Sequence, residues 1–498
     1  MADVILFRPK VSTTEARAIR PRPPLGLLFV AAPLVKNGYK VSIIDAETDF
    51  NWLQDLDREL SDSTICVGVS SMTGTQILGG LKFAKAVKDK VSVPIVWGGL
   101  HATMLPDQTI NNELVDVVVR GEGEDTFLNI VNILKDKGSL DEAPNVWWKK
   151  NNSICSNPSE RFVDINSLPE LPYDLVDCEM YIKTKRSSHP GCKRVFDIHT
   201  DRGCPHRCGF CYNINANRRK WRPFTASKVI EDIDYLVKRF SLDGLNFLGD
   251  NFFVDKKRVV HICEEIIKRN INIKWHADCR IDYFVKYEDS FIDLLKRSGC
   301  ELLTFGVESG SERMLEVINK DISLGDLFKA NKKLKDWQIG VNYHFMAGFP
   351  EEKKEDVFET YNVMLKLSNE YPGAVFLGPS VYTPYPGTPL YDRSIEMGLK
   401  PPDKLEEWAR FDWDGNSSLP FITPEYSKWL MASVNVVKNA NTVKRIFATR
   451  LAKWWFKMRI EMIVKFNMVG PQIEEKAINF AKAIVTLAKK ILRVRRDV

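Results

Sequence analysis

Three closely spaced cysteines are the residues of this sequence best suited to chemistry. Cys204, Cys208 and Cys211 form a CxxxCxxC pattern within the segment DRGCPHRCGFCY, directly after an apolar β-like run at 195–200. Three thiolates on one loop can bind three irons of a [4Fe–4S] cluster. Because such a cluster normally takes four thiolates, one iron stays open for a substrate or cofactor. We therefore expect these cysteines to ligate a cluster of this kind.

A structural zinc site is the alternative for the same three cysteines. Zinc in a closed site needs a fourth ligand nearby. His206 lies inside the loop, where it would strain the chelate, and the sequence has no second CxxC pair. A second cluster is not predicted either, because Cys155, Cys178 and Cys192 are too irregularly spaced.

Two α/β segments must position this loop and its partners. Residues 1–140 alternate short β-like runs with amphipathic segments, which predicts a Rossmann-like, doubly wound parallel sheet. Residues 195–395 contain six further β-like runs and predict a partial (β/α)6 barrel. A β-hairpin and linker are expected over 141–194, and a helical, basic region over 396–498. Glycine-rich turns end several strands of the first segment, where such sheets bind ligands, although the glycines could serve only as tight turns.

The composition is that of an ordinary globular protein with two or three domains. The chain has 498 residues, of which 44% are hydrophobic and 27% charged, which disfavours disorder and a membrane-spanning bundle. The first ten residues lack the basic flank of a secretory signal, and no run of 18 apolar residues occurs. We therefore expect a cytoplasmic protein, in which ten cysteines do not form a disulfide framework.

The net charge of +6 is distributed unevenly. Residues 438–498 carry fifteen Lys or Arg against four Asp or Glu, or +11, and the rest of the chain is at −5. This tail predicts two basic amphipathic helices, which suit peripheral contact with the inner face of an anionic membrane. Their apolar faces could instead pack on the barrel. Nucleic acid is not an expected partner, because the body is acidic. The predicted apolar positions of the first helix are Phe447, Leu451, Trp454, Met458 and Met462.

The cysteine loop resembles the signature of the radical S-adenosylmethionine (SAM) superfamily, CxxxCxΦC with an aromatic Φ. Segments at the ends of the following strands also resemble SAM-contacting motifs of that superfamily. The resemblance implies that SAM chelates the open iron and is cleaved reductively to a 5′-deoxyadenosyl radical. Each polar residue assigned in this way could instead be satisfied by neighbours at the barrel mouth. The residues that the resemblance assigns to SAM binding are Phe210, Asp250, Asn251, Arg280, Glu308, Ser309 and Gly348.

The turns of residues 1–140 resemble those of the cobalamin-binding domain found in one subgroup of that superfamily. The DxHxxG motif of many cobalamin proteins is absent, because Asp197-Ile198-His199 has no glycine in register. The resemblance therefore implies that cobalt is bound without a protein histidine. The alternative is a degenerate domain that binds no cobalamin. The residues assigned to cobalamin binding are Ser70, Ser71, Gly98, Gly99, His101, Gly121, Glu122 and Gly123.

Together the motifs imply a cobalamin-dependent radical SAM enzyme. We expect a C-methyltransferase that acts on an unactivated carbon of a small-molecule or lipid-like substrate, with an electron donor such as a flavodoxin or ferredoxin. One alternative is a radical SAM cyclase or rearrangement enzyme that resembles the anaerobic porphyrin ring-forming branch. Another is a non-enzymatic cluster protein for electron transfer or iron sensing. No motif identifies a catalytic residue on the substrate side.

Overall fold

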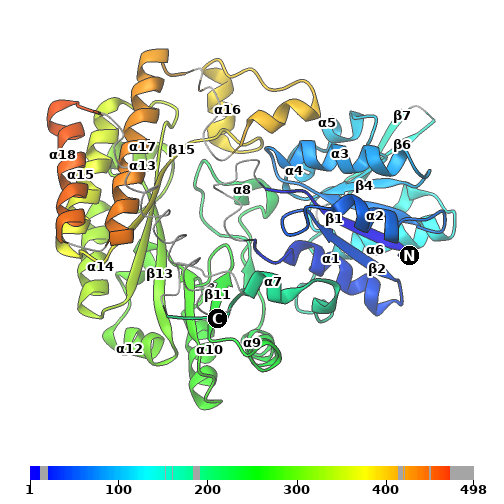
Figure 1. Cartoon of the computed structure of the whole chain (residues 1–498), viewed down its shortest axis with the longest axis horizontal. Helices are drawn as coiled ribbons and strands as arrows, with labels where there is room; N and C mark the ends of the chain where they lie inside the picture. Colours follow the sequence, from blue (N-terminus) through cyan, green and yellow to red (C-terminus); the bar gives the residue numbers. More distant parts are fainter. Residues whose placement is uncertain are drawn as a thin grey trace, which may run out of the picture.

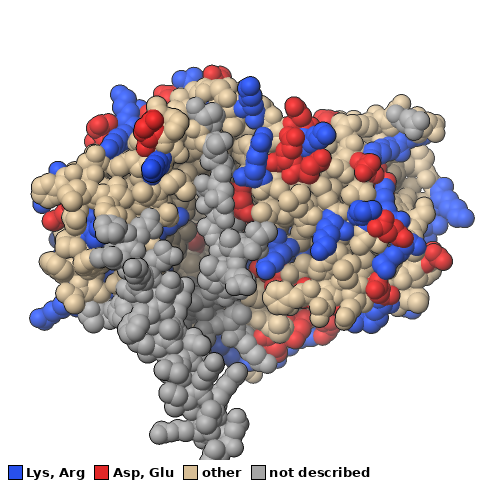
Figure 2. All heavy atoms as spheres, turned by 45° about the horizontal axis from the view of Figure 1, so that its top comes forward, with Lys and Arg blue, Asp and Glu red and all other residues tan. Residues whose placement is uncertain are grey.

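Two β-sheets with their covering helices lie side by side, and two long C-terminal helices flank the second sheet on its outer side (Figure 1). This computed structural model describes residues 1–11, 21–151, 153–159, 161–182, 191–412, 419, 421–447 and 450–470. On the face in Figure 2, basic and acidic side chains are interleaved over the described surface.

The first sheet has seven strands in the order β2-β1-β3-β4-β5-β6-β7. Its first five strands are parallel, and β6 and β7 form an antiparallel hairpin that extends the sheet. The strands are β1 (Val4–Arg8), β2 (Val41–Asp45), β3 (Cys66–Ser70), β4 (Ile95–Gly98), β5 (Val117–Val119), β6 (Val146–Lys150) and β7 (Ser153–Asn157). The helices are α1 (Leu25–Lys36), α2 (Trp52–Glu59), α3 (Gln76–Lys88), α4 (Leu100–Met104), α5 (Pro106–Asn111) and α6 (Glu124–Lys135).

Both faces of the first sheet are buried, as the near-continuous apolar runs of its strands require. Alternate residues of β1 point to opposite faces: Leu6 packs with α1 and α6, whereas Phe7 packs with α2 and α3. The predicted doubly wound Rossmann-like sheet is therefore confirmed. The short helix η3 (Leu405–Arg410) returns from beyond the barrel and buries Trp408 in the core on the α3 side.

The second sheet has six parallel strands in the order β15-β14-β13-β12-β11-β8, and its two end strands do not pair. This open arrangement confirms the predicted partial barrel. The strands are β8 (Val195–His199), β11 (Gly244–Leu248), β12 (Lys274–Asp278), β13 (Cys300–Glu308), β14 (Gly340–Ala347) and β15 (Val375–Val381). The helices are α9 (Ala226–Phe240), α10 (Lys256–Lys268), α11 (Ile281–Phe284), α12 (Asp289–Arg297), α13 (Glu312–Val317), α14 (Leu324–Asp336), α15 (Lys354–Glu370) and α16 (Pro389–Glu396).

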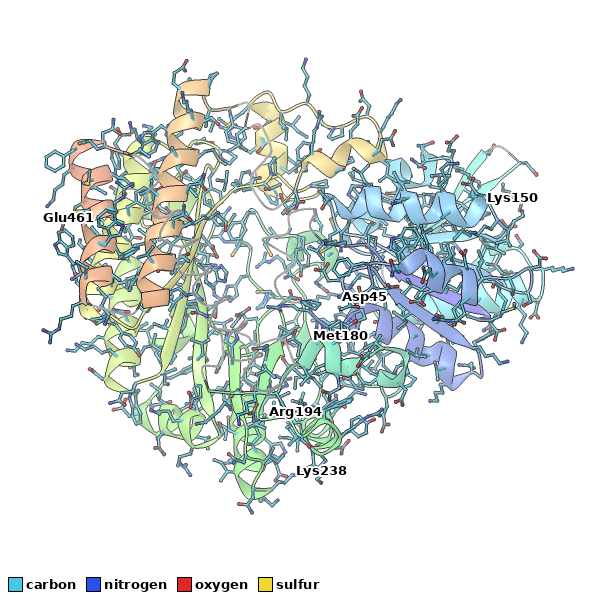
Figure 3. The ribbon with its side chains drawn as sticks, in the orientation of Figure 1. Asp45, Lys150, Met180, Arg194, Lys238 and Glu461 are labelled. Carbon is cyan, nitrogen blue, oxygen red and sulfur yellow. The ribbon has the colours of Figure 1, made fainter. Side chains whose placement is uncertain are left out.

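A short helix in the connecting segment, α7 (Cys178–Ile182), fastens the two sheets together. The Tyr181 hydroxyl donates a hydrogen bond of 2.6 Å to Asp45 Oδ2 at the end of β2. Arg194, just before β8, pairs with Glu179 on the same helix. Figure 3 shows Asp45 near Met180 of this helix, with Arg194 on the barrel side. The connecting segment thus sets the relative position of the two sheets.

The C-terminal helices α17 (Pro424–Phe447) and α18 (Arg450–Phe466) pack on the barrel and on each other. In α18 the buried apolar stripe contains Phe456, whose ring stacks on Phe376 with 5.7 Å between centroids. Two residues of the apolar stripe predicted from the sequence, Leu451 and Trp454, are instead 71% and 55% exposed. The second predicted tail helix lies outside the described residues. Among the described helices, none combines the length and apolar character needed to cross a bilayer.

Lys444 on α17 gives the fold a specific pH dependence. Its Nζ donates to Ser368 Oγ and to the Ala374 carbonyl oxygen, each at 3.0 Å, and burial lowers the pKa of Lys444 to about 7. The unfolded lysine keeps its proton to much higher pH, so unfolding takes up a proton above pH 7. We expect the free energy of unfolding to rise by about 3 kcal/mol between pH ~7 and ~9.5 relative to Lys444→Met. Urea unfolding across this range measures it, and parallel pH profiles for the two proteins would contradict it.

Candidate functional site

Asp250 organises the cysteine loop. The loop runs from β9 (Asp201–Arg202), just after β8, to α8 (Asn213–Ala216). Asp250 Oδ2 accepts from the Gly203 backbone N–H at 2.5 Å, and Oδ1 accepts from the Tyr212 hydroxyl at 3.0 Å and from Asn213 Nδ2 at 2.9 Å. Asp250, which the resemblance assigns to SAM binding, therefore also binds the cysteine loop itself.

The loop places three thiols without forming a site for a single metal ion. Among the described residues, no three His, Cys, Asp or Glu side chains are grouped as around one ion. Burial raises the pKa of Cys211 to about 11 and also raises the pKa of Cys204. These thiols would ionise on binding iron, whose charge stabilises the thiolate.

Arg280 and Asn251 lie against the sulfur atoms. Arg280 Nη1 is 4.0 Å from Cys208 Sγ, while its other nitrogens donate to Asp282 and to the Lys320 carbonyl oxygen at 2.8 and 2.9 Å. Asn251 Nδ2 lies 3.7 Å from Cys204 Sγ. Asn251 Oδ1 is buried and accepts no hydrogen bond from the described residues. A buried acceptor beside the cluster fits the ammonium group of SAM.

A buried ion pair completes this side of the loop. Lys320 Nζ lies 2.8 Å from Glu308 Oε1, with both side chains 9% exposed, and 5.7 Å from the centre of the Phe210 ring. Burial opposes the charge of Lys320, but Glu308 more than offsets it, so the pKa of the lysine is raised. Sequence reasoning missed Lys320, because it lies in a turn after α13 with no motif around it. Only the fold brings it to Glu308.

Two residues assigned to SAM binding, Ser309 and Gly348, have contacts that also stabilise the fold. The Ser309 hydroxyl is fully buried, 3.3 Å from Thr360 Oγ1, and accepts from the Ser311 backbone at 3.2 Å. The end of β13 packs under α15, and the Ser309 hydroxyl lies at that contact. Gly348 has a φ of +84°, and a Cβ there would lie 3.0 Å from Leu419. Its N–H donates to the buried carboxyl of Glu352, whose pKa burial raises to about 8.

A cavity of about 390 Å³ lies between the two sheets and reaches into the first. The first sheet contributes the end of β3 and the glycine turns after β4 and β5, and the barrel contributes His199, Arg202, Tyr212 and Asp250. A Cβ on Gly26 or Gly121 would meet no atom within 4 Å. These glycines leave an open cradle for a large flat ligand, which fits cobalamin. The assigned residues that line the cavity are Ser70, Gly98, Gly99, Gly121, Glu122 and Gly123.

Ser71 and His101, which the resemblance assigns to cobalamin binding, do not line this cavity. Gly99, with a φ of +91°, begins α4 and directs His101 into the core. His101 Nδ1 lies 2.9 Å from Thr73 Oγ1, and its ring lies 5.6 Å from that of Trp408. Burial lowers the pKa of His101 to about 4, so the imidazole is neutral at pH 7. Ser71 is only 1% exposed.

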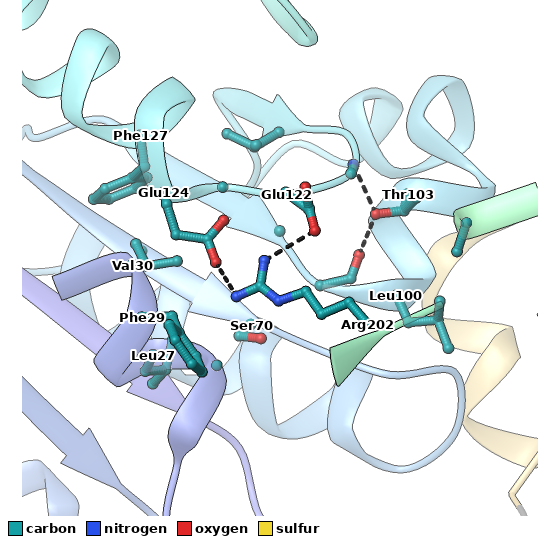
Figure 4. Close-up of a pocket in the computed structure, with 18 of the residues that line it drawn as sticks. Leu27, Phe29, Val30, Ser70, Leu100, Thr103, Glu122, Glu124, Phe127 and Arg202 are labelled. Atoms are coloured by element: carbon teal, nitrogen blue, oxygen red, sulfur yellow. Dashed lines mark hydrogen bonds and ion pairs between the residues drawn. The ribbon is translucent and has the colours of Figure 1, made fainter. Parts of the chain in front are cut away.

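Arg202 joins the cysteine loop to the wall of the cavity. Its Nη1 donates to Glu122 Oε1 at 2.9 Å and its Nη2 to Glu124 Oε1 at 2.6 Å, as Figure 4 shows. Arg222 also pairs with Glu122, at 2.8 Å. The Arg202 guanidinium lies 4.8 Å from the centre of the Phe29 ring. Sequence reasoning placed Arg202 beside the cluster, but its partners come from the other sheet and were not predicted.

Filling the glycine cradle should weaken cobalamin binding without unfolding the protein. At Gly98 a Cβ would meet only the Val119 carbonyl oxygen, at 4.0 Å, and the residue has ordinary strand geometry. In Gly98→Val the side chain would project into the cavity, so we expect the dissociation constant of hydroxocobalamin to rise at least about tenfold. Absorbance titration measures it. An unchanged affinity in a variant with a normal unfolding transition would place cobalamin elsewhere.

Comparison with known proteins agrees with this geometry. Residues 198–364 match the family model "Radical SAM superfamily", and residues 20–131 match "B12 binding domain". An uncharacterized methyltransferase, PH0819, from Pyrococcus horikoshii is 30% identical over 80% of this chain and 84% of its own. The anaerobic magnesium-protoporphyrin IX monomethyl ester cyclase of Rubrivivax gelatinosus is 25% identical over 84% and 73%. The hopanoid C-3 methylase of Methylococcus capsulatus is 26% identical over 73% and 67%.

Two solved structures share the fold. The radical SAM methyltransferase TsrM from Kitasatospora setae, with cobalamin and a [4Fe–4S] cluster bound, has a TM-score of 0.63 at 17% identity, covering 86% of this chain and 83% of its own. The cobalamin-dependent radical SAM enzyme OxsB has a TM-score of 0.68 at 18% identity, covering 99% and 80%. The family models and the Pyrococcus relative show the family. The chain therefore belongs to the cobalamin-binding radical SAM family, and it is an enzyme that uses a [4Fe–4S] cluster, SAM and cobalamin.

Proposed function

We propose that this enzyme transfers a methyl group to an unactivated carbon. One observation carries the proposal: the cobalamin cavity and the cysteine loop share a wall, because Asp250 lines the cavity and holds the loop through Gly203, Tyr212 and Asn213. A substrate between them would meet both reactive groups. The resemblance to PH0819, a methyltransferase, supports the same function.

The residues of the chain would bind, orient and shield these groups. When bound, the cluster, SAM and cobalamin supply an electron, a carbon radical and a methyl group. We propose that Cys204, Cys208 and Cys211 hold the cluster and that the orphan Oδ1 of Asn251 orients the SAM ammonium. Lys320 fixes Glu308, whose remaining oxygen can accept from ribose hydroxyls. The aromatic ring of Phe210, 6.0 Å from that of Phe349, would help to exclude water from the radical.

Product analysis tests this proposal. Anaerobic protein loaded with iron, sulfide and cobalamin is incubated with SAM, a strong reductant and candidate substrates. Methyl transfer predicts a methylated product together with S-adenosylhomocysteine and 5′-deoxyadenosine. Formation of 5′-deoxyadenosine with a changed substrate but without S-adenosylhomocysteine would overturn it.

Ring formation is a second candidate, favoured by the resemblance to the Rubrivivax cyclase over 84% of this chain. A cyclase would use the same cluster loop and the same cavity, so the geometry does not separate the two reactions. The product analysis does: ring formation predicts a product that lacks an added methyl group. In either reaction we propose an electron donor such as a flavodoxin or ferredoxin.

We further propose peripheral membrane contact and a lipid-like substrate, in line with the resemblance to the hopanoid methylase. The support is the outer face of α18, where Leu451 and Trp454 are exposed beside Lys453 and Lys457. Leu451→Glu/Trp454→Glu should reduce sedimentation with phosphatidylglycerol vesicles several-fold. The matched control is Phe50→Glu, at a 75% exposed position before α2. Equal sedimentation of the double variant and the control would count against membrane contact through α18.

A further inference from the structure

A second cavity, of about 430 Å³, adjoins the cobalamin cavity. Its walls come mainly from three parts of the chain: the turn after β5, the segment that follows the β6–β7 hairpin, and the α8 region after the third cysteine. Residues of α4, Asn145 and Gly387 complete the lining. The two cavities share Thr103, Gly121, Glu122 and Ala216. A ligand in the second cavity would therefore lie beside bound cobalamin.

Each part of the chain contributes one arginine to this cavity, which we call the arginine cavity. They are Arg120 from the turn after β5, Arg161 from the segment after the hairpin, and Arg218 from the loop after α8. Among the described residues lining the cavity, the one acidic side chain is Glu122, which is already paired with Arg202 and Arg222. Arg120 and Arg161 thus bring positive charge to the lining.

Two of these arginines are available to a ligand. The guanidinium groups of Arg120 and Arg161 make no hydrogen bond or ion pair with any residue that the structure describes. Arg218 is oriented by the ring of Phe162, 4.0 Å from its guanidinium carbon; Arg222 lies at the same distance from that ring. The like charges of Arg120 and Arg161 repel one another, and an anion between them would relieve that repulsion.

Neutral donors add to the charge. The amide of Asn145 and the hydroxyl of Ser159 also line the arginine cavity. Guanidinium groups bind tetrahedral oxyanions through paired N–H donors, and a hydroxyl or amide can satisfy the remaining oxygens. A purely apolar ligand would leave these donors without partners, at a cost in free energy.

We propose that the arginine cavity binds a phosphate-type oxyanion group. Two ligands could present such a group next to the cobalamin cavity: a substrate that carries a phosphate or phosphonate, and cobalamin itself, through the phosphodiester of its nucleotide loop. Binding of either ligand in the arginine cavity does not depend on whether the enzyme transfers a methyl group or forms a ring. Failure of this inference would therefore leave the proposed function untouched.

Calorimetric titration of the full-length protein with inorganic pyrophosphate tests the inference. Arg120→Ala/Arg161→Ala should weaken pyrophosphate binding at least about tenfold, because two charge-assisted contacts are lost. Both positions are exposed, so the fold should survive. The matched control is Arg297→Ala, an exposed arginine on α12 that pairs with Asp293 at 2.7 Å, and it should bind pyrophosphate as the wild type does.

Two further arms identify the source of the oxyanion. If pyrophosphate binds cobalamin-loaded protein with the same dependence on Arg120 and Arg161, the cavity serves a substrate. If bound cobalamin excludes pyrophosphate, and the double variant weakens binding of hydroxocobalamin but not of cobinamide, which lacks the phosphodiester, the cavity serves the cofactor. Equal binding of pyrophosphate and of hydroxocobalamin by the wild type and the double variant would overturn the inference.

Discussion

Replacing Lys320 by methionine is expected to destabilise the barrel by about 3–5 kcal/mol, because it leaves the Glu308 carboxylate buried without its partner. The two charges are 2.8 Å apart and each side chain is 9% exposed. The midpoint of urea unfolding of the cluster-free protein, monitored by tryptophan fluorescence, measures the effect.

A double variant separates the lost pair from lost packing. In Lys320→Met/Glu308→Gln the buried charge is gone, so most of the lost stability should return. Lys320→Arg keeps the charge and should cost less than the methionine variant. If Lys320→Met unfolds at the same urea concentration as the wild type, the ion pair of Lys320 with Glu308 does not stabilise the barrel.

Replacing Arg202 by methionine is expected to cost about 3 kcal/mol and to weaken cobalamin binding. Arg202 is the partner of Glu124, whose second oxygen is buried without a hydrogen bond from the described residues. It also pairs with Glu122 in the cavity wall. Without Arg202, the repulsion between the two carboxylates would open the boundary between the sheets, so the dissociation constant for hydroxocobalamin should rise at least about tenfold.

Arg222→Met is the matched control for this variant. It removes one partner of Glu122 but leaves Arg202 bound to both carboxylates. Cobalamin affinity should therefore fall much less than in Arg202→Met. Equal effects of the two substitutions on affinity would show that the link between the cysteine loop and the cavity is not specific to Arg202.

The architecture could be predicted from the sequence because the spacing of residues along the chain determines which elements form. Three cysteines within eight residues must lie on one loop, and alternating β-like and amphipathic runs leave few arrangements other than parallel sheets. The glycines that line the cobalamin cavity were visible as turns at strand ends, where parallel sheets bind ligands. The cavity lining at Gly98, Gly121 and Glu122 follows from that topology.

Contacts between distant segments could not be predicted in the same way. The pairs of Lys320 with Glu308 and of Arg202 with Glu124 depend on how strands and loops meet in space. His101 follows a glycine turn but points into the core, which the positive φ of Gly99 decides. In α18 two apolar stripes share the helical period, and only packing against Phe376 selects the stripe that contains Phe456.

The most direct test of methyl transfer needs no known substrate. Cobalamin-loaded, reduced protein is mixed with SAM that carries a deuterated methyl group, and the adenosyl products are quantified against cobalamin-free protein. Methyl transfer through cobalamin predicts S-adenosylhomocysteine in an amount stoichiometric with bound cobalamin, and none from cobalamin-free protein. Cleavage of SAM to 5′-deoxyadenosine alone, equal with and without cobalamin, would contradict it.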